Sequence, residues 1–140
     1  ASLKVLLVGF KVSNLPFRSK WDPKSKQYFP ILPPGIECIS WIEAAATPLF
    51  DYEVIIMDLS TFPTIDVLIN SRVEPSRFFE SLRSQIYKHL IRKERGLIIC
   101  FSAKPRQPVP FHETNYEMFP GIPEIITEPG VGYYFQKSGK

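Results

Sequence analysis

Three continuous apolar runs set the strongest limit on how this 140-residue chain folds. They are residues 3–9 (LKVLLVG), 53–59 (EVIIMDL) and 97–102 (LIICFS). A strand with one face in water alternates apolar and polar side chains, whereas a strand buried on both faces of a parallel sheet is apolar along its length. The three runs therefore predict the central strands of a parallel sheet. Residues 36–42 (IECISWI) alternate more clearly, which predicts a fourth strand nearer the sheet edge.

One long amphipathic helix is predicted between residues 77 and 95, where apolar side chains recur at spacings of three and four. Pro75 suits the first turn of this helix, and Gly96 suits the residue that ends it. Gly96 leads directly into the apolar run 97–102, and this order is half of a βαβ unit. We interpret His89 as an exposed residue of this helix. A shorter helix is predicted at residues 42–46.

Prolines mark two segments that do not fit a regular βαβ pattern. Eleven of the 14 prolines lie in residues 11–35 and 105–140. A helix is incompatible with the proline spacing of the first segment, so we expect a loop whose aromatic side chains pack on one face of the sheet. In the second segment, residues 125–128 and 131–136 are predicted to pair as strands around Glu128-Pro129-Gly130.

The expected architecture is one three-layer α/β domain over residues 1–140, with a mainly parallel sheet and a loop-rich cover on one face. The chain has two Cys and two His, without the ligand spacing of a zinc site, so we expect no metal. Gly9 is followed by no second or third Gly and by no predicted helix, so we expect no dinucleotide or flavin phosphate loop and no cofactor. No apolar run reaches the length of a membrane span, and the first residues lack the pattern of a signal peptide. We therefore expect a cytoplasmic domain that has no membrane partner.

Asp58 ends an apolar strand at the sheet edge where open α/β folds bind ligands. This segment resembles the phospho-acceptor strand of response-regulator receiver domains, and Ser102 and Lys104 resemble the receiver residues that contact the phosphoryl group. The resemblance implies a signalling domain with Asp58 as phospho-acceptor. Receivers hold Mg²⁺ with an acidic pair after the first strand, whereas this chain has Gly9-Phe10-Lys11 there. The alternative is that Asp58 accepts hydrogen bonds from a loop at the strand end.

Across residues 3–103, the order of apolar strands, basic helix and glycine resembles class I glutamine-amidotransferase-like domains, which have a flavodoxin-like fold and include non-catalytic members. Active members carry a nucleophilic Cys on a tight turn flanked by Gly. Cys100 has no such glycine and is followed closely by Pro105, so the resemblance implies a degenerate domain. The leading hypothesis is a non-catalytic ligand-sensing or protein-interaction domain of a larger protein or assembly. Its candidate ligand-binding residues are Gly9, Asp58, Ser102 and Lys104.

A basic, aromatic segment supports a further hypothesis. Residues 11–30 contain five Lys or Arg against one Asp, together with several aromatic rings. Cations bind phosphates and aromatic rings stack on bases, so this composition is typical of nucleic-acid-binding surfaces. The same residues also suit a sheet cover with solvated lysines, or a docking surface for a protein partner. The candidate residues are Arg18, Lys20, Trp21, Lys24, Lys26 and Tyr28.

Overall fold

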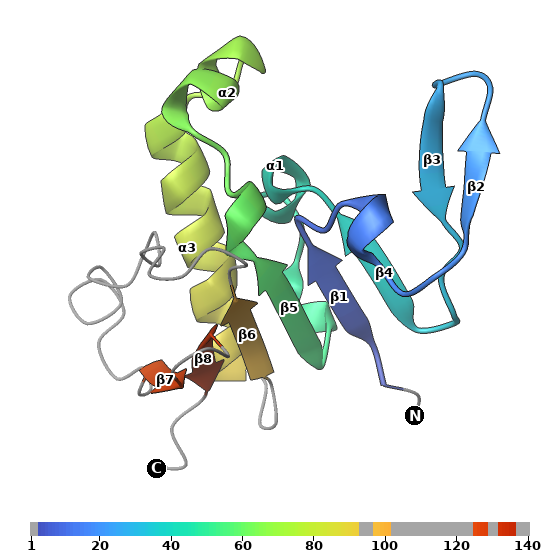
Figure 1. The fold of residues 1–140 in the computed structure, drawn as a ribbon. Coiled ribbons are helices and arrows are strands. Elements are labelled where there is room, and N and C mark those ends of the chain that lie inside the picture. Colours follow the sequence, from blue (N-terminus) through green and yellow to red (C-terminus); the bar gives the residue numbers. More distant parts are fainter. Residues whose placement is uncertain (1–2, 93–96, 102–124, 129–131, 137–140) are drawn as a thin grey trace.

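The computed structural model describes residues 3–92, 97–101, 125–128 and 132–136, which form a mixed α/β fold (Figure 1). Its main sheet has the strand order β4-β1-β5-β6-β8-β7. The first four strands run parallel, and β8 and β7 continue the sheet with antiparallel pairing. The strand bounds are β1 Val5–Val8, β4 Ile36–Ile39, β5 Val54–Asp58, β6 Leu97–Phe101, β7 Ile125–Glu128 and β8 Gly132–Gln136.

Each segment predicted as a strand forms a strand in the structure, although the bounds differ by a few residues. All three continuous apolar runs lie in the parallel part of the sheet, as β1, β5 and β6, and the alternating run supplies β4 at the sheet edge. The predicted pairing of residues 125–128 with residues 131–136 is also found, between β7 and β8. The edge strand is shorter than expected, because the chain already turns into a helix at Trp41.

Three α-helices are described: α1 (Trp41–Ala44), α2 (Ile65–Asn70) and α3 (Pro75–Arg92). Three short 3-10 turns accompany them: η1 (Val12–Asn14), η2 (Leu49–Asp51) and η3 (Leu59–Thr61). Helix α3 is the predicted long helix and begins at Pro75. The Glu74 carboxylate accepts hydrogen bonds from the backbone amides of Ser76 and Arg77, at 3.1 and 2.9 Å, and these bonds lower its pKa. Helix α2 was not predicted from the sequence.

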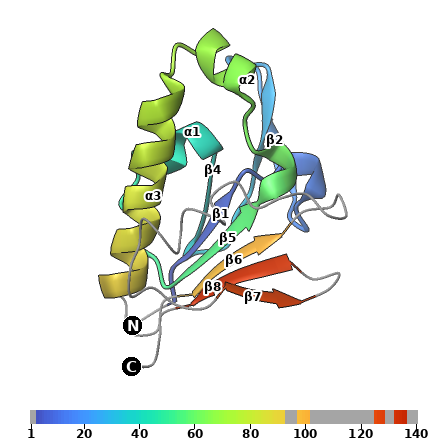
Figure 2. The ribbon, with the colours of Figure 1, turned by 90° about the vertical axis from the view of Figure 1, so that its left-hand side faces the viewer.

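The core lies between the sheet and α3, which covers one sheet face together with α1 (Figure 2). Successive residues of a strand point to opposite faces, and the fully buried Leu6, Val8, Ile55, Met57 and Ile98 belong to this core. Helix α3 contributes Phe78, Leu82 and Ile86, at the spacing of one helix face. No described helix is long and apolar enough to cross a bilayer.

The interpretation of His89 as an exposed residue is wrong. Its side chain is fully buried, one turn beyond Ile86 on the core face of α3. Its Nε2 lies 2.9 Å from the backbone carbonyl oxygen of Tyr52. A carbonyl only accepts hydrogen bonds, so Nε2 carries the proton and donates. A polar histidine at a core position needs a hydrogen-bond partner, and the tertiary structure provides one in the Tyr52 carbonyl. This partner lies 37 residues away, so the sequence pattern of the helix does not reveal it.

The predicted cover over residues 11–35 is also wrong in its main feature. This segment contains a separate two-stranded hairpin of β2 (Ser19–Asp22) and β3 (Gln27–Pro30), which stands away from the main sheet (Figure 1). Trp21, Tyr28 and Phe29 are 47%, 58% and 48% exposed, so they do not lie on the sheet.

The hairpin turn explains why the segment does not remain a loop. The Asp22 carboxylate accepts hydrogen bonds from the Lys24 amide at 3.1 Å and the Ser25 hydroxyl at 2.8 Å, which lowers its pKa. The Lys26 amide donates to the Asp22 carbonyl at 2.8 Å. Asp side chains stabilise turns in this way.

Some residues of the sequence predictions lie outside the part of the chain that the structure describes. They are Gly96, Ser102, Lys104 and residues 105–124.

Candidate functional site

The carboxyl edge of the parallel strands contains a topological switch point between β1 and β5. From β1 the chain connects to β4 on one side, and from β4 it crosses back to β5 on the other side of β1. Open α/β sheets bind ligands in the crevice outside the strand ends at such a point. Gly9 directly follows β1 and Asp58 ends β5, so the fold brings these two predicted residues to the expected place.

Protein side chains fill this crevice. The Trp41 indole Nε1 donates to the Asp58 carbonyl oxygen at 3.0 Å and to Thr61 Oγ1 at 3.2 Å. The Thr61 hydroxyl in turn donates to the Gly9 carbonyl oxygen. A Cβ atom at Gly9 would lie 2.3 Å from Trp41 Nε1, and Gly9 has a φ of +80°. Gly9 is therefore required by the backbone conformation and by the indole, and there is no room for a phosphate at this position.

Asp58 stabilises the loop after its own strand. The residue is 4% exposed. Its Oδ1 accepts hydrogen bonds from the backbone amide and the hydroxyl of Ser60, at 2.9 and 2.6 Å. This is the loop-capping alternative that the sequence left open. The other two residues of the predicted ligand site, Ser102 and Lys104, lie outside the described residues.

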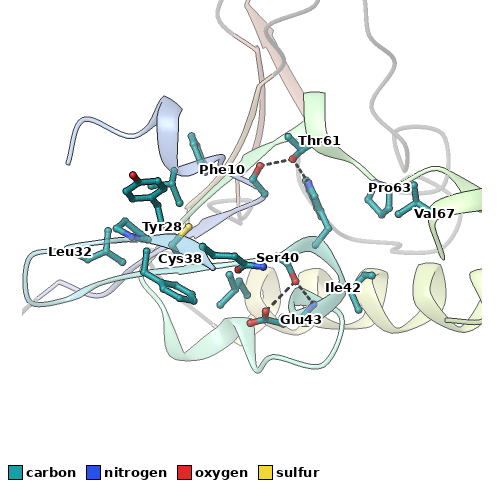
Figure 3. A pocket seen from close by; sticks show the side chains of 17 residues that line it. Phe10, Tyr28, Leu32, Cys38, Ser40, Ile42, Glu43, Thr61, Pro63 and Val67 are labelled. Atoms are coloured by element: carbon teal, nitrogen blue, oxygen red, sulfur yellow. Dashed lines mark hydrogen bonds between the residues drawn. The ribbon is translucent and has the colours of Figure 1, made fainter. Parts of the chain in front are cut away.

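An open pocket of about 620 Å³ lies beside the filled crevice, over the ends of β1 and β4. One wall is strand β3 with Leu32, and the floor includes Cys38 and the start of α1 (Figure 3). Thr61, Pro63 and Val67 lie on the far side of the pocket from Tyr28 and Leu32. Four segments that are distant in the sequence thus meet here, and the size falls within the range of small-molecule sites.

Ser40 and Glu43 supply most of the polar character of the pocket floor. The Ser40 hydroxyl accepts from the Glu43 amide at 3.2 Å and donates to Glu43 Oε1 at 3.3 Å. This arrangement caps the first turn of α1, in the manner of a capping box. Among the described residues that line the pocket, Glu43 is the only one with a formal charge.

Cys38 contributes a thiol that is poorly suited to nucleophilic attack. The side chain is half-buried in the pocket floor. Burial, together with the negative charge of Glu43, raises the pKa of the thiol. The reactive form of cysteine is the thiolate, so Cys38 is protonated at neutral pH. In the part of the chain that the structure describes, no three His, Cys, Asp or Glu side chains are grouped as a metal site.

The six candidate residues of the basic, aromatic segment divide between different surfaces. Trp21 and Tyr28 are cross-strand partners with ring centroids 4.9 Å apart, yet only Tyr28 lines the pocket. Strand alternation places Arg18 and Lys20 on the hairpin face opposite these rings. Lys24 and Lys26 lie in the hairpin turn. All four cations are exposed, and none lines the pocket.

Trp41, Glu43 and Thr61 are site residues that the sequence reasoning missed. Ser40-Trp41-Ile42-Glu43 matches the S-x-x-E capping-box pattern, which would have placed the start of α1 correctly. No comparable signal marks Thr61, whose role depends on the approach of Gly9 from 52 residues away. No protein-family model, curated protein or solved structure matches the chain.

Proposed function

We propose that this chain is a non-catalytic binding domain that senses a ligand, or docks a partner, through the pocket at the carboxyl edge of β1 and β4. The observation that carries the proposal is the convergence of β3, β4, α1 and the β5–α2 connection on one open pocket. Its lining is mainly apolar and aromatic, with a few polar groups that would orient a ligand, as is typical of small-molecule sites.

The chemistry of the described site supports binding rather than catalysis. Cys38 has a raised pKa, and Asp58 is buried in its own loop. A thiol nucleophile is activated by a lowered pKa, whereas burial and the charge of Glu43 raise the pKa of Cys38. The receiver-like alternative is less favoured, because Ser60 holds Asp58 Oδ1 in a loop-capping arrangement and Gly9-Phe10-Lys11 supplies no acidic pair for Mg²⁺.

The finer architecture is part of the proposal. We infer a three-layer, flavodoxin-like arrangement similar to a degenerate amidotransferase-like domain, acting within a larger protein or assembly.

Helix α2 supports an interaction role because Ile65, Val67 and Ile69 are 58%, 48% and 57% exposed. Apolar side chains gathered on one short helix are unusual for a surface without a partner.

The pocket hypothesis is tested with N-phenyl-1-naphthylamine, a neutral probe that fluoresces in apolar sites. We expect saturable binding with one site per chain. Val67→Asp should weaken this binding at least about fivefold, because a charged side chain in an apolar site costs more than 1 kcal/mol. Ile69→Asp is the matched control, since Ile69 lies on the same helix, is similarly exposed and does not line the pocket. Equal effects of the two variants would contradict the pocket assignment.

Single-stranded nucleic acid remains a second candidate ligand, for which the exposed Trp21–Tyr28 ring pair beside the hairpin cations is the favouring observation. Base stacking on exposed rings contributes about 1–3 kcal/mol per base. If this function is correct, an oligothymidine should quench Trp21 fluorescence at low salt, and Lys24→Ala with Lys26→Ala should weaken the effect. Quenching that is absent, or insensitive to salt, would exclude it.

A further inference from the structure

We propose that the pocket selects an organic cation, an amine or quaternary ammonium group on an apolar body, with Glu43 supplying the opposite charge and with the rings of Tyr28 and Phe10 lining the same pocket. This inference rests on the proposed function, because it names the ligand class for the same pocket. It excludes the anionic ligands that open α/β folds commonly bind at this edge.

The first support is the charge of the pocket lining. Glu43 is exposed, and its Oε1 is held by the Ser40 hydroxyl, while Oε2 makes no hydrogen bond with the described residues. The sequence has no Lys or Arg between residues 31 and 71, which include the β4–α1 floor and the far wall. Burial and, as the smaller cause, the negative charge of Glu43 raise the pKa of Cys38, which lies in the same pocket floor.

The second support is that the backbone amide of Gly9, which directly follows the first strand, is already engaged. A phosphate at this edge binds to backbone amides that follow the first strand. Here the Gly9 amide donates to the Ile39 carbonyl oxygen at 3.0 Å. Trp41 and Thr61 occupy the space above Gly9. The exposed hairpin cations do not compensate, since none of them lines the pocket.

The third support is the placement of aromatic rings. Tyr28 is 58% exposed on one wall, and Phe10 lies between that wall and Thr61 (Figure 3). Cations are attracted to the faces of aromatic rings, and recognition of quaternary ammonium groups uses rings combined with apolar contact. Leu32, Ile42 and Val67 supply the apolar contact for the body of such a ligand.

The test compares three small probes on the same phenylpropyl scaffold by isothermal titration calorimetry: 3-phenylpropyl-trimethylammonium, the neutral 3-phenylpropan-1-ol and the anionic 4-phenylbutyrate. We expect the ammonium compound to bind at least about fivefold more tightly than the alcohol, which corresponds to one partly exposed charge interaction with a cation–π contact. We expect the carboxylate to bind more weakly than the alcohol.

Glu43→Gln should reduce the preference for the ammonium compound over the alcohol to about onefold, because only the ammonium compound loses a charge interaction. Asp66→Asn is the charge-matched control, because Asp66 lies in the first turn of α2 and does not line the pocket. Tyr28→Leu, at an exposed position, is a second variant that keeps the inference testable if Glu43→Gln loosens α1. It should weaken the ammonium compound more than the alcohol.

The outcomes separate the two proposals. Equal binding of the ammonium compound and the alcohol, with N-phenyl-1-naphthylamine still bound, would overturn the cation inference and leave the pocket function intact. Tighter binding of 4-phenylbutyrate would also overturn it. If neither these compounds nor the naphthylamine probe binds to the folded protein, both the inference and the proposed function are wrong.

Discussion

The indole nitrogen of Trp41 donates to the backbone carbonyl of Asp58 at 3.0 Å, and this bond joins the first turn of α1 to the end of β5. Both residues are almost fully buried. The bond lies at the carboxyl end of the sheet, where open α/β folds bind ligands, and the open pocket lies beside it, toward β4 and the hairpin.

The contact between Gly9 and Trp41 gives the first prediction. Gly9→Ala should destabilise the protein by about 2 kcal/mol or more, because the residue has a positive φ and the new methyl group would overlap the indole. Urea unfolding measures the loss. Trp41→Phe removes Nε1, so the double variant should lose less stability than the sum of the single variants. Strict additivity would show that Gly9 and Trp41 do not meet.

Asp58 should behave as a structural carboxylate rather than a phosphorylation site. Asp58→Ala leaves the Ser60 amide and hydroxyl without an acceptor, at a cost of about 1–3 kcal/mol. Asp66→Ala, at an exposed position in α2, should change the free energy of unfolding by less than about 0.5 kcal/mol. Incubation with acetyl phosphate and Mg²⁺ should add no mass to the protein. A mass gain of one phosphoryl group at Asp58 would contradict this role.

Tyr52 makes stability sensitive to high pH. Burial and the hydrogen bond from its hydroxyl to the Glu37 carboxylate raise its pKa from 10.0 to about 12. A folded-state pKa above the unfolded value means that the stabilisation is complete below pH 10 and is lost as the pH rises toward 12. Tyr52→Phe should cost about 1 kcal/mol at neutral pH, from the lost hydrogen bond.

The control for this prediction is the difference between the two proteins across the same pH range. Lysines also titrate there, but they do so in both proteins. The stability difference between wild type and Tyr52→Phe should therefore shrink between pH 10 and 12. A difference that stays constant would show that the Tyr52 hydroxyl ionises normally in the folded state.

Cys38 should react slowly with iodoacetamide at pH 8, because its raised pKa leaves little thiolate. Glu43→Gln removes one cause of the raised pKa, so alkylation should become faster. It should remain slower than for an unfolded peptide, since burial, the larger cause, is unchanged. Peptide mapping by mass spectrometry distinguishes Cys38 from Cys100. A rate that does not respond to Glu43→Gln would show that the carboxylate does not act on the pocket floor.

The strands were predictable because their signal is local. Runs such as those around Leu6, Ile55 and Ile98 are apolar at successive positions, and short runs of that composition are typical of strands with little solvent contact. The start of α3 at Pro75 was also predictable from the sequence, since Pro suits the first helical turn. For Asp58, the strand-end position indicated the right edge of the sheet, and the loop-capping alternative proved to be its role.

The tertiary structure decided which polar and aromatic side chains are buried. His89 and Trp41 are buried because distant carbonyl oxygens, those of Tyr52 and Asp58, accept their N–H groups. Trp21 and Tyr28 are exposed because their hairpin pairs with itself rather than with the sheet. A sequence determines local preferences such as strand, helix and turn, whereas hydrogen-bond partners tens of residues away determine burial. For this protein, the apolar pattern determined the sheet, and contacts between distant segments determined where its pocket is open.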